Sequence, residues 1–282
     1  MVRRIIRLIA LLSLAGALLF GIGIWQAQQD PVLVPYRVTL AGLRAPLTMV
    51  QLSDVHVGRD MSPNRVARVV AAINGFKPDV IVLTGDYVSG DPEAWSLAET
   101  RDALAPLTDL RAPLGVYAVV GNHDDVARTR WALTGSKITL LNNDSIDIGP
   151  LVFVGADDFK GPGRPVEVMR RLVRTEKGDK PVIVLGHRPE FFQWLPERSE
   201  LMLVGHTHGG QVLLPWATET LMGETMFARR RGVFGNRGQS LIVSSGLGTT
   251  FLPVRWGVPP EIVVVSLVPV GYSVGRKSGT DK

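Results

Sequence analysis

The chain has 282 residues and a hydrophobic content of 45%, which is enough for one large folded domain with an apolar extension. Its formal net charge is +5, but residues 1–30 and 270–282 each contribute +2, so the middle of the chain carries only +1. A nucleic-acid binder needs a strongly basic face, so we expect no nucleic-acid partner. The absence of cysteine excludes disulfides, thiolate nucleophiles and cysteine-ligated zinc.

The first predicted element is an apolar segment near the N-terminus. Three arginines within residues 1–7 precede residues 8–25, which carry no charge and would span roughly 27 Å as a helix, close to the thickness of a bilayer core. We expect residues 1–27 to form a membrane anchor that inserts through residues 5–25. The arginines favour a cytoplasmic N-terminus, which predicts an inner-membrane protein with the remainder of the chain on the outer, periplasmic side.

Two alternatives to an anchor stay open. A cleaved signal peptide would have a shorter apolar core and an Ala-x-Ala-like cleavage site, which the sequence Ile24-Trp25-Gln26-Ala27 matches poorly. A twin-arginine export signal is suggested by Arg3 and Arg4, although the residues around them match loosely.

Beyond this segment, residues 28–46 predict a linker running into an edge strand, and a folded domain is expected over residues 47–269. Apolar runs predict buried strands at residues 47–52, 79–84, 115–120, 151–155, 181–185, 201–204, 241–246 and 261–265. Helical spacing or composition predicts helices at residues 62–75, 92–107 and 165–175. A shorter strand pair is expected around a turn at residues 142–145. Residues 215–238 show no periodicity, and the polar tail 270–282 is expected to be disordered.

The order of these elements favours a mixed α/β class. Strands alternate with helices in the first two-thirds of the chain and follow one another in the last third. This order predicts two packed sheets with helices outside them. No internal repeat is visible.

Seven polar side chains follow predicted strands, where α/β proteins build their sites. They are Asp54, His56, Asp86, Asn122, His187, His206 and His208. Imidazoles, carboxylates and an amide oxygen without sulfur suit two divalent ions such as Mn²⁺, Fe or Zn²⁺. In an extended Asp54-x-His56 both side chains would point to one face, and the same holds for His206 and His208 if that segment stays extended.

Asp86 has two carboxylate oxygens and could bridge the two ions. Such a pair can clamp the attacking and leaving oxygens of an in-line displacement at phosphorus, with a shared water as nucleophile. Each residue also has an ordinary alternative: Asp54 and Asp86 as turn residues, Asn122 at a positive φ, His123 as a packed histidine. All five histidines of the chain follow apolar runs, and this shared placement favours the metal site.

As an ordered set, these motifs resemble the signature of the calcineurin-like metallophosphoesterase superfamily over about residues 47–267. The motifs are Asp54-x-His56, Gly85-Asp86, Gly121-Asn122-His123-Asp124, Gly186-His187 and Gly205-His206-x-His208. Later segments are similar to its bacterial membrane-associated or exported phosphodiesterase branch: Gly209-Gly210-Gln211, Ser245-Gly246-Leu247-Gly248, Pro253-Val254-Arg255 and Pro260-Glu261. The resemblance implies a four-layer α/β/β/α sandwich of two mixed sheets with a binuclear metal centre between them.

The resemblance also implies a role for each residue. One ion would be held by Asp54, His56 and His208. The other ion would be held by Asn122, His187 and His206. Asp86 would bridge the two ions. His123, paired with Asp124, would lie over the substrate and help the leaving oxygen to depart.

Together these implications predict a membrane-anchored, metal-dependent phosphoesterase in which a metal-bridging hydroxide attacks phosphorus. The branch resemblance favours a phosphodiester or pyrophosphate substrate. A lipid or a nucleotide-sugar could carry the phosphate ester. The basic residues Arg230, Arg231 and Arg255 are the candidates for binding its phosphate, with Arg229 and Arg237 nearby in sequence. A solvated basic loop is the alternative for these arginines.

Three other functions stay open. The chain could act on phosphomonoesters. It could be a UDP-acyl-sugar pyrophosphatase of the lipid A type, but that substrate is cytoplasmic and conflicts with the expected topology. A non-catalytic binding scaffold is disfavoured, because such scaffolds lose ligands and this chain keeps every ligand of the motif set.

Overall fold

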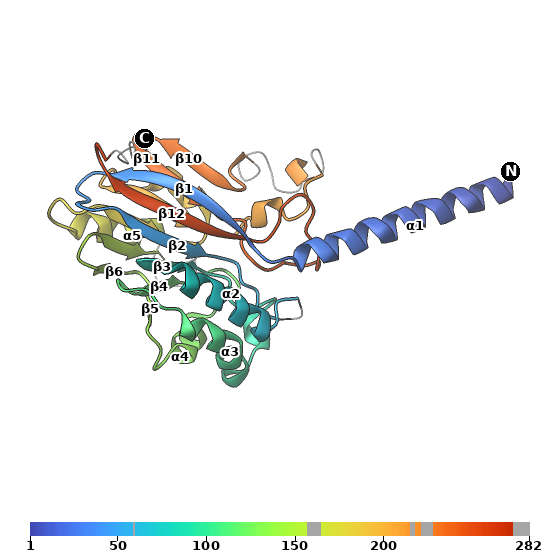
Figure 1. The fold of residues 1–282 in the computed structure, drawn as a ribbon, viewed down its shortest axis with the longest axis horizontal. Coiled ribbons are helices and arrows are strands. Elements are labelled where there is room, and N and C mark those ends of the chain that lie inside the picture. The colour runs from blue at the N-terminus through green and yellow to red at the C-terminus, as the bar shows by residue number, and fades with distance from the viewer. Residues whose placement is uncertain (59, 157–164, 215–217, 221–227, 273–282) are drawn as a thin grey trace, which may run out of the picture.

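Figure 1 shows the computed structural model of the chain, in which a sheet-and-helix body carries one long helix that projects from one end. The structure describes all residues except 59, 157–164, 215–217, 221–227 and 273–282. Most of the tail that we expect to be disordered therefore lies outside the described residues.

The first sheet mixes parallel and antiparallel pairs. Its spatial order is β1 (Val32–Leu40), β12 (Glu261–Pro269), β2 (Leu47–Leu52), β3 (Val80–Thr84), β4 (Val116–Val119) and β5 (Ile138–Leu140). Strands β2 to β5 run parallel, β12 runs antiparallel to β2, and β1 runs parallel to β12 at the edge. The carboxyl ends of β2, β3 and β4 therefore meet at one end of the sheet.

The second sheet is built in the same way around a parallel centre. Its spatial order is β10 (Gly232–Asn236), β11 (Gln239–Val243), β9 (Ser199–Val204), β8 (Val182–Leu185), β7 (Val152–Gly155) and β6 (Asp144–Asp147). Strands β7, β8, β9 and β11 are parallel, and β6 and β10 are antiparallel edges. The central strands are buried on both faces, which explains their continuous apolar runs.

Helices cover the outer face of each sheet, and apolar side chains such as Met49, Phe153 and Leu203 fill the space between the sheets. The first sheet is covered by α2 (Pro63–Phe76), α3 (Leu97–Leu104) and α4 (Val126–Ala132), and the second by α5 (Pro165–Thr175). Short 3-10 helices are η1 (Pro92–Ala94), η2 (Ala105–Asp109), η3 (Pro189–Trp194) and η4 (His208–Gly210). The four-layer α/β/β/α sandwich implied by the resemblance is confirmed.

The sequence around α2 shows how local chemistry sets an element. Ser62 caps the first turn by accepting the backbone N–H of Arg65, and Pro63 occupies the first helical position. The helix ends at Phe76, one residue later than expected. Lys77 adopts a left-handed conformation with φ of 54° and closes it there.

Two other expectations are wrong, and one helix that the structure contains is not predicted from the sequence. The helix expected at residues 92–107 is divided, because Ser96 forms a capping box with Glu99 and starts α3 anew. Helix α4 is an unexpected element, capped by Asp125. The turn at residues 142–145 does not join a hairpin, because β5 belongs to the first sheet and β6 to the second.

Helix α1 (Val2–Ala27) projects from the body over most of its length and is long and apolar enough to cross a membrane. Its buried residues are Gly23 and Ala27, near its C-terminal end. There Arg65 donates to the carbonyls of Ala27 and Gln29, at 2.9 and 2.7 Å. The end of the helix is therefore fixed to the domain at the start of α2.

Arg255 is fully buried close to this junction. Its guanidinium donates to backbone carbonyls at the start of the loop after β11: Ser245 at 2.7 Å, Gly246 at 3.2 Å and Gly248 at 2.6 Å. Burial lowers the pKa of Arg255 to about 10, which leaves it charged at neutral pH. These contacts give Arg255 a structural role in place of the substrate contact expected from the sequence.

Replacing Arg255 with methionine should lower the free energy of unfolding of the full chain in detergent by about 3–5 kcal/mol, since buried carbonyls would lose charged donors. Arg198 is a matched control, because it also donates to two carbonyls but is only half-buried. Arg198→Met should cost about 1 kcal/mol or less. Urea unfolding curves measure both values, and equal losses would contradict the structural role.

Candidate metal centre

The seven expected ligands gather at the carboxyl ends of strands from both sheets. Asp54 and His56 follow β2, Asp86 follows β3, and Asn122 follows β4. In the second sheet the remaining residues follow β8 and β9: His187, His206 and His208. Because the two sheets pack face to face, these loops meet at one end of the sandwich.

The backbone is left-handed at five of the seven residues. Their φ values are 49° at Asp54, 46° at His56, 57° at Asp86, 70° at His206 and 51° at His208. Neither the Asp54-x-His56 nor the His206-x-His208 segment is extended, so the alternation of side chains along a strand does not apply to them. The side chains converge because the chain turns at each of these positions. Such conformations cost on the order of 1–3 kcal/mol each and cluster at functional sites.

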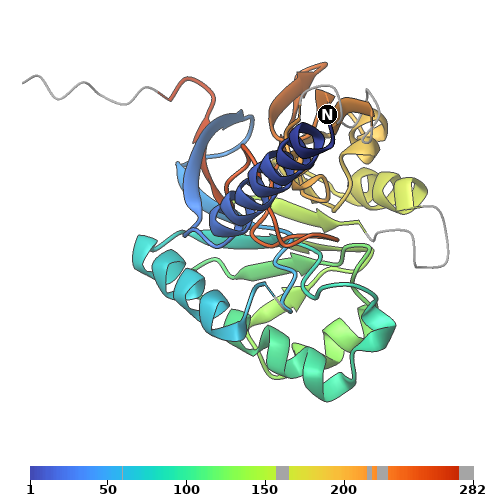
Figure 2. The same cartoon turned by 90° about the vertical axis from the view of Figure 1, so that its right-hand side faces the viewer.

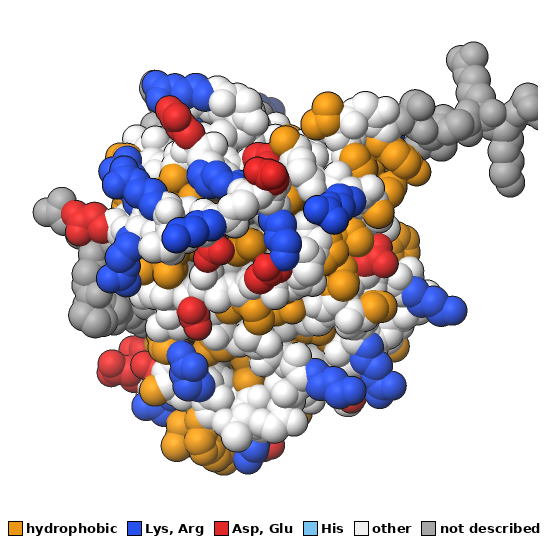
Figure 3. Space-filling model, turned by 90° about the vertical axis from the view of Figure 1, so that its left-hand side faces the viewer, with side chains coloured by type: hydrophobic (Ala, Val, Ile, Leu, Met, Phe, Trp, Pro, Cys, Tyr) orange, Lys and Arg blue, Asp and Glu red, His pale blue; other side chains and the backbone are white. Residues whose placement is uncertain are grey.

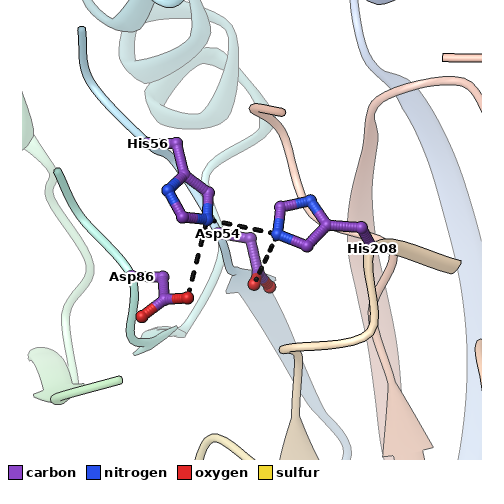
Figure 4. A group of neighbouring side chains, drawn as sticks. All are labelled: Asp54, His56, Asp86 and His208. Carbon is purple, nitrogen blue, oxygen red and sulfur yellow. Dashed lines mark hydrogen bonds and ion pairs between the residues drawn. The ribbon is translucent and has the colours of Figure 1, made fainter. Parts of the chain in front are cut away.

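The first group of side chains comprises Asp54, His56, Asp86 and His208, all of them buried (Figure 4). The Nε2 atoms of His56 and His208 lie 3.1 Å apart. His208 Nε2 is 3.4 Å from Asp54 Oδ1, and His56 Nε2 is 3.5 Å from Asp86 Oδ2. Four potential donor atoms thus surround one small volume.

A second group comprises Asp86, His187 and His206, and it shares Asp86 with the first. His187 Nε2 lies 3.1 Å from Asp86 Oδ2, the same oxygen that faces His56. The other oxygen, Oδ1, accepts the backbone N–H of His123 at 2.7 Å, which fixes the orientation of the carboxylate. One oxygen of Asp86 is therefore shared by imidazoles from opposite sheets.

Hydrogen bonds decide which ring nitrogens face inward as acceptors. His56 Nδ1 lies 3.2 Å from the carbonyl of Val88, and His187 Nδ1 lies 2.7 Å from the carbonyl of Thr84. A carbonyl only accepts, so Nδ1 carries the proton in each ring. In a neutral imidazole Nε2 then presents a lone pair toward the Asp86 carboxylate. At this spacing the Nε2 lone pairs and the carboxylate oxygen repel one another, so a cation between them is needed to stabilise the arrangement.

Burial reinforces this demand for a cation. It lowers the pKa of His56 to about 4 and that of His206 to about 3, so both imidazoles are neutral at pH 7. Burial also raises the pKa of Asp54 to about 6. Neutral imidazoles and buried carboxylates are the protonation states in which these groups bind divalent metals.

Asn122 adds an unsatisfied amide oxygen to this set of potential ligands. Its Oδ1 is buried, and among the described residues it has no hydrogen-bond partner. A buried amide oxygen without a donor is costly unless a ligand satisfies it. The donor set present therefore fits divalent metal ions, and which residue binds which ion stays a prediction.

His123 and Asp124 do not form the pair implied by the resemblance. Asp124 is buried and accepts the backbone N–H groups of Asp86, Tyr87 and Gly121, at 2.7, 2.8 and 2.8 Å. The half-buried His123 ring instead places Nδ1 2.6 Å from the carbonyl of Gly90. Its centroid lies 5.2 Å from that of His56, edge to face. Asp124 thus orders the loop backbone, and His123 lies at the rim of the first group.

A close backbone approach explains one glycine of the motifs. A Cβ at Gly205 would overlap Ser53 Oγ and Asp54 Oδ2. The absence of a side chain there lets the backbone N–H of His206 donate to both oxygens of Asp54, at 3.1 Å each. This contact joins the β2 and β9 loops across the two sheets.

Three arginines lie near the two groups. Thr207 Oγ1 donates to the carbonyl of Arg230, and a Cβ at Gly209 would lie 3.3 Å from Arg231 Cδ, which places both arginines beside η4. Arg188 Nη1 lies 3.0 Å from His206 Nε2. Sequence reasoning missed Arg188, although its position directly after His187 was a usable signal.

Comparison with known proteins gives a family match over most of this domain. The family model described as calcineurin-like phosphoesterase matches residues 47–218. An uncharacterized metallophosphoesterase of Aquifex aeolicus is 31% identical over 230 residues, which is 78% of this chain and 85% of that protein.

Two further relatives are longer than this chain. A protein of Caenorhabditis elegans named as a metallophosphoesterase is 30% identical over 92% of this chain and 57% of its own length. A transmembrane protein with metallophosphoesterase domain from Danio rerio is 28% identical over 89% of this chain and 60% of its own length. The chain therefore spans less than two-thirds of both relatives.

The shared oxygen of Asp86 leads to a test by metal analysis. Asp86→Asn keeps the side-chain volume and an acceptor for His123 but removes the negative charge between the groups. We expect its affinity for Mn²⁺ or Zn²⁺ to fall at least about tenfold, measured by elemental analysis after dialysis at set metal concentrations. Asp147→Asn is the control, because Asp147 pairs with Lys180 on the surface. A metal content equal to that of the control would exclude Asp86 as a ligand.

Proposed function

The chain belongs to the calcineurin-like phosphoesterase family, and we propose that it is a membrane-anchored enzyme that cleaves phosphodiester or pyrophosphate bonds. Membership of this family indicates a phosphoric ester hydrolase that uses divalent metals. The proposal adds two ions per chain, drawn from Mn, Fe or Zn, and the bond that is cleaved.

The observation that carries the proposal is the position of Asp86 Oδ2 between His56 Nε2 and His187 Nε2, at 3.5 and 3.1 Å. Each imidazole belongs to one of the two ligand groups, so one carboxylate oxygen serves both. Two divalent ions bound by these groups would supply Lewis-acid polarisation of phosphoryl oxygens and an acidified water. Oxygen and nitrogen donors without sulfur fit the hard or borderline ions named above.

We assign His123 to the leaving oxygen. Because its Nδ1 is bonded to the Gly90 carbonyl, its Nε2 is the nitrogen that can hold or release a proton. Asp124 is a positioning residue that ties the loops after β3 and β4 together through Tyr87 and Gly121. The two strands thereby deliver Asp86 and His123 in fixed relative positions.

The substrate phosphate is assigned to arginines at the rim. A planar guanidinium pairs with two phosphate oxygens at once. Arg188, Arg230 and Arg231 are the proposed partners, since they lie beside His206 and η4. Arg255 is left out because its donors are used by carbonyls in the interior.

We further propose that α1 anchors the chain in the inner membrane with the catalytic domain on the periplasmic side. The length and composition of α1 suggest a membrane protein, and so does the name of the Danio rerio relative. The arginines that precede the apolar segment support the orientation.

A comparison of two esters tests the function and the role of His123 together. The full chain with Mn²⁺ should hydrolyse both a nitrophenyl and an alkyl phosphodiester, and a chelator should abolish both activities. His123→Ala should lower kcat for the alkyl ester by about 10²–10⁴-fold, because an alkoxide needs a proton to leave. The loss should be much smaller for nitrophenolate, which is a stable leaving group.

The metal content of His123→Ala is the internal control and should match that of the wild-type chain. Equal losses on both esters, or a loss of metal, would reject this assignment. Full activity after exhaustive chelation would reject the metal-dependent mechanism itself.

A further inference from the structure

The loop formed by residues 249–256 presents large apolar side chains beside the base of α1. Phe251 is 95% exposed and Leu252 is 55% exposed. Phe251 also has a φ of 58°, a conformation that bulky residues rarely adopt. Backbone strain combined with an exposed aromatic ring is typical of a functional contact rather than of folding alone.

The loop is attached directly to α1. Trp256 Nε1 donates to the carbonyl of Leu19, and the backbone N–H of Arg255 donates to the carbonyl of Gly23, both at 3.0 Å. A Cβ at Gly23 would lie 3.0 Å from both Val254 and Trp256, so the helix and the loop are in close contact there. The loop therefore moves with the last turns of the helix.

These contacts fix the depth of the loop in a membrane. The apolar run of α1 ends at Trp25, before Gln26, and Leu19 lies six residues, or about 9 Å, further inside it. When α1 spans a bilayer, the loop bonded to Leu19 and Gly23 must lie at the level of the membrane interface. Exposed Phe and Trp side chains are favoured at that level.

The same loop is joined to the metal-ligand segments on its other side. Gln211 directly follows η4. Its side chain donates to the carbonyls of Thr250 and Leu252 at 3.0 Å and accepts the backbone N–H of Thr250 at 2.8 Å. The loop starts after Gly248, where a Cβ would lie 2.8 Å from that of His56. Few residues therefore separate the level of the membrane interface from the candidate metal centre.

The arrangement of charge agrees with this orientation. Figure 2 views the molecule from the end where α1 projects, and the loop lies beside its base. Figure 3 shows the opposite face, where Lys and Arg side chains alternate with Asp and Glu around small apolar areas, as expected of a face in water. The domain thus has a membrane-proximal end that holds the site and a charged distal end.

We propose that the 249–256 loop inserts Phe251 and Leu252 into the lipid bilayer, so that the metal centre opens at the membrane surface and acts on phosphoester headgroups of membrane lipids. The substrate class rests on the proposed phosphoesterase function. The place of the loop does not, because it follows from the contacts with α1.

Fluorescence quenching in nanodiscs of phosphatidylethanolamine and phosphatidylglycerol tests the place of the loop. The chain has no cysteine, so Phe251→Cys gives one thiol for an environment-sensitive fluorophore. Val270→Cys is the matched control. It is 70% exposed and follows β12, which runs antiparallel to β2, so it lies at the end opposite the site. Nitroxide-labelled lipids should remove most of the signal at 251 and leave that at 270 unchanged, and aqueous iodide should do the reverse.

Quenching at 251 by iodide as strong as at 270 would overturn the proposal. Protection of 251 from both quenchers, with dimers in the nanodiscs, would identify a second copy as the occupant and overturn it as well.

An activity comparison tests the substrate class. The double variant Phe251→Ser/Leu252→Ser should lose at least about tenfold in kcat/KM on phosphatidylglycerol in nanodiscs and keep its rate on a water-soluble nitrophenyl diester. Val270→Ser should keep both rates. Equal losses on both substrates would contradict the lipid assignment. Wild-type protein inactive on every ester would count against the phosphoesterase function, and the quenching result would still decide where the loop lies.

Discussion

The structure depends on one electrostatic constraint at the junction of its two sheets. The Nε2 atoms of His56 and His187 face the same oxygen of Asp86, and the Nε2 atoms of His56 and His208 lie 3.1 Å apart. In a buried site these acceptors repel one another, and a cation between them turns the repulsion into attraction. The left-handed backbone at five of the seven expected ligands is the conformational cost of this convergence.

The architecture offsets that cost by fixing several loops at the site through side-chain contacts with their backbone. Asp124 holds the loops after β3 and β4 through backbone N–H groups, and Arg255 holds the loop after β11 through carbonyls. The next part of that loop carries Trp256 to α1. The candidate metal centre, the buried arginine and helix α1 are therefore linked by one continuous set of contacts, and this explains why the site lies at the α1 end of the sandwich.

Sequence reasoning reached the fold class and the grouping of the five aspartate and histidine positions around Asp86, because both depend on buried strands and on the polar residues directly after their carboxyl ends. It failed where the outcome depends on specific side-chain contacts with the backbone, which apolar patterns do not show. Nothing near Arg255 indicates that its guanidinium is used by carbonyls of residues 245–248. The alternation rule for Asp54-x-His56 assumed a strand that had already ended. Likewise, Ser96 and Asp125 start helices that apolar periodicity alone does not reveal.

The central claim is that one carboxylate serves two ions. Anomalous X-ray scattering from crystals grown with Mn²⁺ tests it most directly, because it locates the metals independently of the protein atoms. The account predicts two peaks per chain about 3.5–4 Å apart, with Asp86 Oδ2 between them. A single peak bound by only one of the two groups, or two peaks that do not share Asp86, would contradict it.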